Sequence, residues 1–247
     1  MPQSALIRMF NSSIDLAPDE ATAVRNLPMQ VRSLRAKQDI VRQGDRPSRS
    51  CTLLEGYACT YQDLHDGRRQ IMAFHVGGDI PDLQSSHLAY LDHSLGTIGP
   101  CTVGFIDHID LRRICQDFPR IAGALWRLTL IDACIFRAWI SNLGARNANR
   151  RAAHLICETA MRMNSIGQVR AGRLNWPFTQ ADLGDALGIS IVHVNRTMQK
   201  LRADGLISLR DRILTIHDWP ALKEFGGFDP DYLHLDLDRL HPDSELH

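Results

Sequence analysis

Residues 179–205 carry hydrogen-bonding side chains in a segment that has the start and stop signals of two short helices. Thr179 followed by Asp182 is typical of a helix start, and Gly188 permits the tight turn that would follow. Ser190 can cap a second helix, which Gly205 would end. The outer face of that second helix would hold one valine and five polar or basic side chains: Val192, Ser190, His193, Arg196, Gln199 and Lys200. Such a face suits hydrogen bonding to base edges in the major groove of DNA.

The apolar residues of the same segment predict a helix-turn-helix rather than an ordinary helical hairpin. Six of them fall where such a motif buries its shared core: Leu183, Leu187, Ile189, Val194, Met198 and Leu201. Gly184 is small where the two helices would cross. Two β-prone runs at 206–209 and 212–216 then predict a hairpin wing, with residues 150–163 as a packing helix and residues 173–178 as a partner strand. The sequence therefore predicts a winged helix-turn-helix.

Basic residues are concentrated in the same part of the chain, although the formal net charge is zero. Residues 1–144 hold 15 basic and 15 acidic side chains, whereas residues 145–217 hold 11 basic and 5 acidic ones. Since lysine and arginine supply the sequence-independent affinity for DNA phosphates, this excess agrees with the motif. Residues 218–247 hold 2 basic and 8 acidic side chains. We expect a solvated tail at 229–245, with autoinhibition of DNA binding as the alternative.

The composition is that of a globular protein with two domains: 247 residues, 44% hydrophobic and 23% charged. There is neither an apolar run of membrane-spanning length nor a basic-then-apolar leader, so we expect a cytoplasmic protein with no membrane partner. The six cysteines are scattered without a C-x-x-C pair. This spacing favours reduced thiols in the core over a metal or cluster site.

Short β-prone runs dominate the first half of the chain. They occupy residues 40–41, 51–54, 58–61, 70–74 and 102–106. Turn residues separate the runs, and Asp66-Gly67 is the strongest hairpin signal among them. This spacing predicts a small antiparallel barrel or jelly roll.

A long helix is predicted at residues 119–143, where Pro119 can start it. One apolar stripe has the 4-3-4-3 spacing of a two-stranded coiled coil: Ala124, Leu128, Ile131, Ile135 and Ala138. We expect this stripe to form the seam of a homodimer, while Leu125, Trp126 and Ile140 pack on the barrel. In the alternative, the first stripe packs only on the barrel of its own chain.

Barrel, long helix and winged helix, in this order, resemble the Crp/Fnr family of bacterial transcription regulators, and the resemblance covers nearly the whole chain. Four motifs carry it: Asp39-Ile40-Val41-Arg42-Gln43-Gly44-Asp45, Leu54-Glu55-Gly56, Phe74-His75-Val76-Gly77-Gly78-Asp79-Ile80, and residues 178–207. The resemblance implies an α+β fold. Its parts would be a sensor β-roll at 1–117, a dimerisation helix at 118–144, a winged helix-turn-helix at 145–220 and an acidic tail at 221–247.

The resemblance also implies function. It predicts a homodimeric regulator whose barrel senses a small-molecule effector and whose winged helices read an inverted repeat in double-stranded DNA, with RNA polymerase as a further partner. By the same resemblance, Ile191, Val192 and Arg196 face base edges, and Arg196 matches an arginine that reads guanine. Five residues are placed near phosphates: Thr179, Gln180, Ser190, His193 and Lys200. The family usually has a glutamate at the position of Val192, which changes the expected half-site.

The sensor motif departs from the family pattern. Members that bind cyclic nucleotides grip the cyclic phosphate with an Arg-Ser pair, and here the corresponding residues are His93 and Ser94. Without a fixed cation a buried phosphate would have little compensation, so we predict a signal other than cyclic AMP or cyclic GMP. Iron–sulfur members carry an N-terminal cysteine cluster, whereas the first cysteine here is Cys51. The effector pocket is predicted to include five residues: Asp79, Asp82, His87, His93 and Ser94.

Four histidines on or beside the barrel leave two alternatives open: His65, His75, His87 and His93. One is a haem- or metal-dependent sensor of the same fold that uses His87 or His93. The other is a cupin-like metalloenzyme with an incidental helical domain. No H-x-H pair occurs, so we predict a regulator that is not an enzyme and has no cofactor or metal.

Overall fold

The computed structural model describes residues 6–7, 9–10, 14–235 and 246. Its internal contacts divide the chain into two compact units: Met1–Leu64 with Ile71–Ala133, and His65–Gln70 with Cys134–His247. Helix α4 (Pro119–Ala145) gives its first part to one unit and its last part to the other. In the part of the chain that is described, no helix has the length and apolar character needed to cross a membrane.

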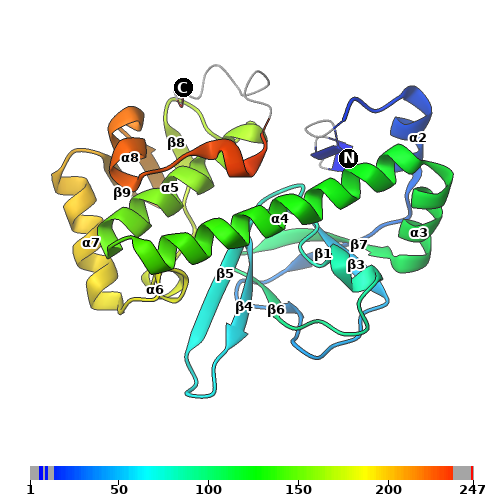
Figure 1. The fold of residues 1–247 in the computed structure, drawn as a ribbon, viewed down its shortest axis with the longest axis horizontal. Coiled ribbons are helices and arrows are strands. Elements are labelled where there is room, and N and C mark those ends of the chain that lie inside the picture. Colours follow the sequence, from blue (N-terminus) through cyan, green and yellow to red (C-terminus); the bar gives the residue numbers. More distant parts are fainter. Residues whose placement is uncertain (1–5, 8, 11–13, 236–245, 247) are drawn as a thin grey trace. The chain divides into compact units, whose positions relative to one another are not determined.

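Two antiparallel sheets make up the β-roll of the first unit (Figure 1). One sheet has the order β1-β7-β3 and the other β2-β6-β4-β5. The strands are β1 (Gln30–Leu34), β2 (Asp39–Val41), β3 (Arg49–Glu55), β4 (Ala58–Asp63), β5 (Arg69–His75), β6 (Ser94–Thr97) and β7 (Cys101–Asp107). Five of them contain the five β-prone runs, so the predicted α+β fold with a β-roll is confirmed. The sequence did not predict β1 and β6.

Two turns of the roll follow from local chemistry. Asp66 accepts a hydrogen bond from the backbone N–H of Arg68 (3.1 Å) and Gly67 has a positive φ of 79°, which closes the predicted turn between β4 and β5. Gly56 lies at a close approach, where an added Cβ would come within 2.7 Å of the Cβ of Cys101. Only glycine fits there, which explains the Leu54-Glu55-Gly56 motif.

Helices cover the roll at its ends and supply a second core. They are α2 (Pro18–Asn26), the short 3-10 helix η1 (Leu83–Ser86), α3 (His108–Asp117) and the first part of α4. Ile121, Ala124 and Leu125 of α4 are buried in this core beside Leu111 and Ile114 of α3. Helix α4 is therefore anchored in the first unit by apolar burial.

The second unit contains the predicted winged helix-turn-helix. Its elements are α5 (Ala148–Ser165), β8 (Arg173–Asn175), α6 (Gln180–Leu187), α7 (Ile191–Ala203), β9 (Ile207–Arg210), β10 (Ile213–Ile216), α8 (Trp219–Gly226) and the 3-10 helix η2 (Pro230–Leu233). Strand β10 pairs antiparallel with both β8 and β9. Asp211 and Arg212 take positive φ values at the tip of the hairpin between β9 and β10, the backbone that a tight two-residue turn requires.

The segment after residue 220 is not simply a tail. Helix α8 packs closely on α5. A Cβ added to Gly226 would lie 2.8 Å from the backbone nitrogen of His154. Phe228 and Leu233 are buried. We expected a tail from residue 221 and a solvated segment from Asp229. Up to Leu233 this expectation is wrong, because the residues in that stretch complete the core of the unit. Residues 236–245, which include most of the acidic stretch, lie outside the described residues.

A buried carboxylate joins α4, α5 and η2. Glu158 of α5 accepts hydrogen bonds from the indole N–H of Trp139 (2.9 Å) and from the hydroxyl of Tyr232 (2.6 Å). Burial raises the pKa of Glu158. The ring of Tyr232 also stacks on His154, whose pKa burial lowers to about 4. Loss of one donor would leave the carboxylate less well compensated.

We expect Tyr232→Phe to lower the free energy of unfolding of the second unit by about 1–3 kcal/mol, because it removes a hydrogen bond to a buried charged group. Urea unfolding followed by tryptophan fluorescence measures this effect, since Trp139, Trp176 and Trp219 lie in that unit. Tyr90→Phe is the matched control, because Tyr90 is exposed. Equal midpoints for Tyr232→Phe and the unmodified protein would contradict the role of the hydroxyl.

Candidate DNA interface and sensor

The turn between α6 and α7 has the caps that the sequence predicts. Thr179 starts α6 with a reciprocal capping box: its Oγ1 accepts from the Asp182 N–H (3.1 Å) and its own N–H donates to the Asp182 carboxylate (2.8 Å). Gly188 ends α6 in the left-handed conformation. The Oγ of Ser190 then accepts from the N–H of His193 at the start of α7 (3.3 Å). These local contacts set the angle at which α7 leaves α6.

The two helices cross closely at Gly184. A Cβ there would lie 2.9 Å from the carbonyl oxygen of Ile189, so the close approach requires glycine. Five of the six predicted core residues are buried: Leu183, Leu187, Val194, Met198 and Leu201. Ile189 is half-buried. The buried set holds α7 by one face and leaves its other face exposed.

The exposed face of α7 carries all three residues predicted to read bases. Ile191 and Val192 are 51% and 62% exposed, and Arg196 is exposed one turn after Val192. Among the described residues Arg196 has no hydrogen bond or ion pair. Seven residues line a depression of about 360 Å³ on this surface: Asn149, Ser190, Val192, His193, Arg196, Thr197 and Lys200. The structure thus brings together five residues that the sequence singled out.

Besides the capping residues Thr179 and Ser190, two further predicted phosphate contacts already have partners. Gln180 and Asn195 form a reciprocal pair of side-chain amide hydrogen bonds that joins α6 to α7. The ammonium of Lys200 lies 2.7 Å from the Asp204 carboxylate. The sequence did not indicate a role for Asn195, because no sequence pattern predicts a contact between two side chains that are 15 residues apart. It also left Arg210 and Arg212 out of the candidate site, although both are exposed at the tip of the wing.

In the first unit, the two acidic residues predicted for the effector pocket have structural partners. Asp79 accepts from the backbone N–H of Val76 (2.8 Å) and closes the turn after β5. Asp82 is buried and accepts from the N–H of Cys51 (2.7 Å), and burial raises the pKa of Asp82 to about 7. The Asp82 carboxyl group therefore holds the loop after β5 against β3, whereas the Asp79 carboxylate closes the turn within that loop.

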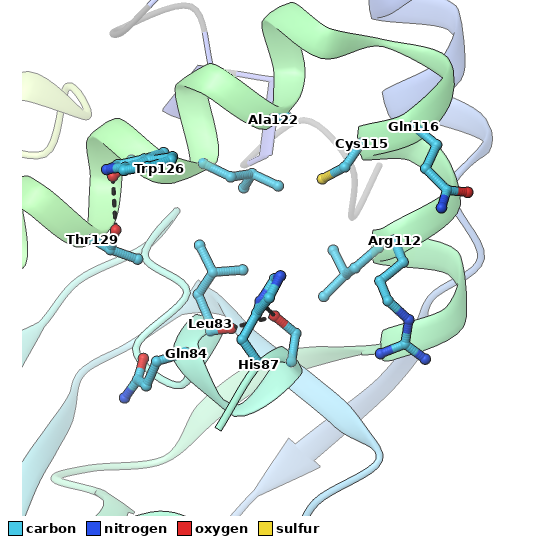
Figure 2. A pocket seen from close by; sticks show the side chains of 12 residues that line it. Leu83, Gln84, His87, Arg112, Cys115, Gln116, Ala122, Trp126 and Thr129 are labelled. Carbon is cyan, nitrogen blue, oxygen red and sulfur yellow. Dashed lines mark hydrogen bonds between the residues drawn. The ribbon is translucent and has the colours of Figure 1, made fainter. Parts of the chain in front are cut away.

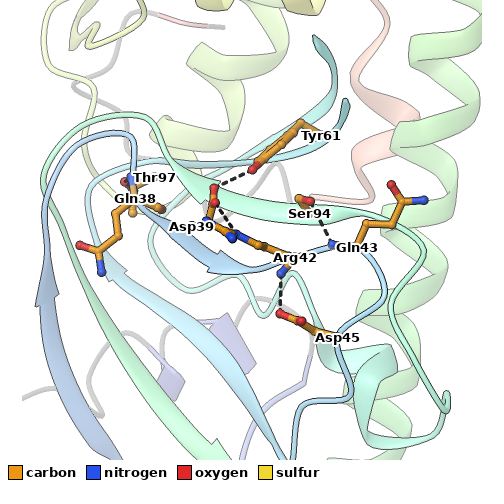
Figure 3. A network of polar contacts seen from close by, with 8 residues as sticks. All are labelled: Gln38, Asp39, Arg42, Gln43, Asp45, Tyr61, Ser94 and Thr97. Carbon is orange, nitrogen blue, oxygen red and sulfur yellow. Dashed lines mark hydrogen bonds and ion pairs between the residues drawn. The ribbon is translucent and has the colours of Figure 1, made fainter. Parts of the chain in front are cut away.

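The histidine and serine that replace the family's phosphate-binding pair also have partners. His93 contacts the Asp92 carboxylate (2.7 Å) and the amide of Gln84 (3.3 Å). The Oγ of Ser94 accepts from the backbone N–H of Gln43 (3.0 Å), as Figure 3 shows. These contacts engage both ring nitrogens of His93 and one acceptor position of the Ser94 hydroxyl.

The cation nearest to this serine in Figure 3 is paired as well. The guanidinium of Arg42 lies 2.9 Å from the Asp39 carboxylate, whose other oxygen accepts from the Tyr61 hydroxyl (2.6 Å). The Asp39-to-Asp45 motif is thus tied together by a surface ion pair, and the side chain of Arg42 remains largely exposed.

His87 lines a cavity of about 540 Å³ between η1, α3 and α4 (Figure 2). The lining of this cavity does not include Asp79, Asp82, His93 or Ser94, so a single pocket formed by all five residues stays a prediction. His75 is buried against the Thr60 hydroxyl (2.7 Å). Among the residues described, no three His, Cys, Asp or Glu side chains are grouped to hold a metal ion.

Comparisons with known families agree with both units. The family model for a "Cyclic nucleotide-binding domain" matches residues 31–118, and that for a "Crp-like helix-turn-helix domain" matches residues 150–225. The Transcriptional activator protein FnrL of Cereibacter sphaeroides is 25% identical over 205 residues, which are 81% of this chain and 82% of the relative. The Nitrogen fixation regulation protein FixK of Bradyrhizobium diazoefficiens is 28% identical over 159 residues, 64% of this chain and 65% of the relative.

Solved structures give the same fold. The structure of FixK2 from Bradyrhizobium japonicum superposes with a TM-score of 0.71 at 22% sequence identity, covering 81% of this chain and 98% of that one. Together, the two domain matches and the fold define a DNA-binding transcription regulator with a cyclic nucleotide-binding-like sensor domain. The chain belongs to the Crp/Fnr family.

Proposed function

We propose that this regulator binds an inverted repeat in double-stranded DNA as a homodimer, in the cytoplasm, and responds to a signal other than cyclic AMP. The observation that carries the proposal is the exposed face of α7, on which Val192 and the unpaired Arg196 share one depression. RNA polymerase is proposed as a further partner by analogy with the family alone.

Base reading is assigned to three residues of α7. The Arg196 guanidinium can donate two hydrogen bonds to O6 and N7 of one guanine. Ile191 and Val192 have no polar side-chain atom, so they suit contact with thymine methyl groups and cannot accept from cytosine. The half-site read by this protein should therefore differ from one read by relatives that have glutamate in place of Val192.

Phosphate contacts are assigned to the ends of the helices and to the wing. Thr179, Ser190 and His193 are exposed beside the N-termini of α6 and α7, where backbone N–H groups attract anions. Lys200 must exchange Asp204 for a phosphate. Arg210 and Arg212 extend the positive surface to the wing. Gln180 contributes through its amide pair with Asn195, which fixes α6 on α7.

Helix α4 is proposed as the dimerisation element, with a corrected seam. Ala124 and Ile135, two of the five predicted seam residues, are 2% and 4% exposed within the single chain, so they offer no surface to a partner. Trp126, Leu130 and Ile140 are instead 69%, 56% and 70% exposed. With Ala133 and Arg137 between them, they repeat the 4-3-4-3 spacing of a coiled-coil seam on another face of the helix.

Arg196→Ala is expected to weaken binding to the specific site by about 1–3 kcal/mol and to relax preference at one base pair in each half-site, while binding to random DNA changes little. Fluorescence anisotropy with the upstream region of the gene and with a scrambled duplex measures both affinities. Arg202→Ala removes an equal charge from the last turn of the same helix and is the matched control. Equal losses on specific and scrambled DNA for Arg196→Ala would refute base reading by Arg196.

Leu130→Lys and Ile140→Lys are each expected to give monomers at micromolar concentration, because they place a charge in the proposed seam. Sedimentation velocity measures the change. Ile109→Lys alters an equally exposed isoleucine on α3 and should remain a dimer. If both α4 variants stay dimeric, the seam lies elsewhere.

Isothermal titration calorimetry is expected to detect no binding of cyclic AMP or cyclic GMP at physiological concentrations. The physical reason is that one imidazole paired with Asp92 cannot replace an arginine fork at a phosphate. His93→Arg in the same titration shows whether a restored cation creates binding. Saturable heat with either nucleotide and the unmodified protein would overturn this view of the sensor.

A further inference from the structure

A cavity in the first unit has the form of a small-molecule site and includes one of the five residues that the sequence assigned to the effector pocket, His87. It has a volume of about 540 Å³, within the range of roughly 300–1,000 Å³ typical of ligand pockets. Three elements line it, with these residues: Leu83, Gln84, Ser86 and His87 of η1, Leu111, Arg112, Cys115 and Gln116 of α3, and Ala122, Leu125, Trp126 and Thr129 of α4.

The lining has an apolar wall and a basic rim. Leu83, Leu111 and Leu125 form the wall, and Figure 2 shows the Cys115 thiol and the His87 ring directed toward the same space. Arg112 is the charged residue of the lining, which contains no aspartate or glutamate. A ligand that satisfies both parts needs an apolar body and a single negative charge.

Arg112 is available to such a ligand. It is exposed and makes no hydrogen bond or ion pair with the described residues. Burial, and after it the charge of Arg112, lower the pKa of the neighbouring His108. A planar guanidinium matches the two oxygens of a carboxylate. The Nδ1 of His87 already contacts the Ser86 hydroxyl (2.8 Å).

We propose that this cavity binds a small amphipathic carboxylic acid, with an aromatic or aliphatic body against the leucines and its carboxylate at Arg112. The proposal deepens the proposed function, because the ligand would be the signal of the regulator. Trp126 and Thr129 line the cavity from α4, and Trp126 also lies in the proposed dimer seam. The bound acid would therefore contact the proposed dimerisation helix.

The test titrates full-length protein, without DNA, with phenylacetate and octanoate, with phenylacetamide and octanamide as neutral partners, and with inorganic phosphate. Calorimetry gives the affinities, and fluorescence of Trp126, the tryptophan of the first unit, reports occupancy of this cavity. We expect at least one acid to bind about tenfold or more tightly than its amide, because a charge-assisted pair is lost in the amide. Phosphate alone should not bind.

Variants assign the site. Arg112→Gln should weaken the acid at least about tenfold and leave the amide unchanged, whereas Arg113→Gln, on the next position of α3, should change neither. Trp126→Phe should abolish the fluorescence response, because it removes the fluorophore that lines the cavity. Equal affinity for acid and amide, an acid affinity unaffected by Arg112→Gln, or no binding of either acid at millimolar concentration would overturn the proposal. Because no DNA is present, these outcomes are independent of whether the protein regulates transcription as proposed.

Discussion

Burial of helix α4 in both units is the constraint on which the rest of the structure depends. Its first turns place Ile121, Ala124 and Leu125 in the core beneath the β-roll, and its later turns donate the Trp139 N–H to the buried Glu158. These residues of α4 are therefore buried by other parts of the same chain. The remaining exposed apolar side chains of α4, Trp126, Leu130 and Ile140, are the ones available to a partner or a ligand.

The sensor unit satisfies its own polar groups where relatives that bind cyclic nucleotides keep a cation for the phosphate. Asp39 with Arg42 and Tyr61, Ser94 with the Gln43 N–H, and His93 with Asp92 form internal contacts. These contacts lie partly at the surface and pair side chains of the roll with one another. The concave surface with an unpaired charge lies instead between η1, α3 and α4. A shared family fold is thus compatible with a different ligand chemistry.

Sequence reasoning succeeded where the signal is local. Thr179, Gly188 and Ser190 act within one turn of the residues they cap, so their roles follow from residue type and spacing. The same holds for the turn at Asp66-Gly67 and for the wing. The orientation of α7 also followed, because its apolar face is narrow and the opposite face is polar.

Prediction from the sequence failed where a residue's place depends on contacts with residues far away in the chain. Helix α4 has apolar residues on most sides, so periodicity alone could not tell which stripe the chain buries, and Ala124 was placed on the wrong face. The acidic composition after Asp218 concealed Phe228, Tyr232 and Leu233, which pack on α5. The pairing of Gln180 with Asn195, and the cavity at Arg112, arise from contacts between elements that no motif encodes.

Selection of binding sites from a random DNA library with the full-length protein tests the central claim most directly. The account predicts enrichment of a two-fold symmetric sequence whose half-site centres lie about one helical turn apart, roughly 10–11 base pairs, because two α7 helices of a symmetric dimer enter successive major grooves. Each half-site should contain a guanine next to positions that favour thymine. Enrichment of a single unsymmetric site, or no enrichment over the starting library, would contradict it.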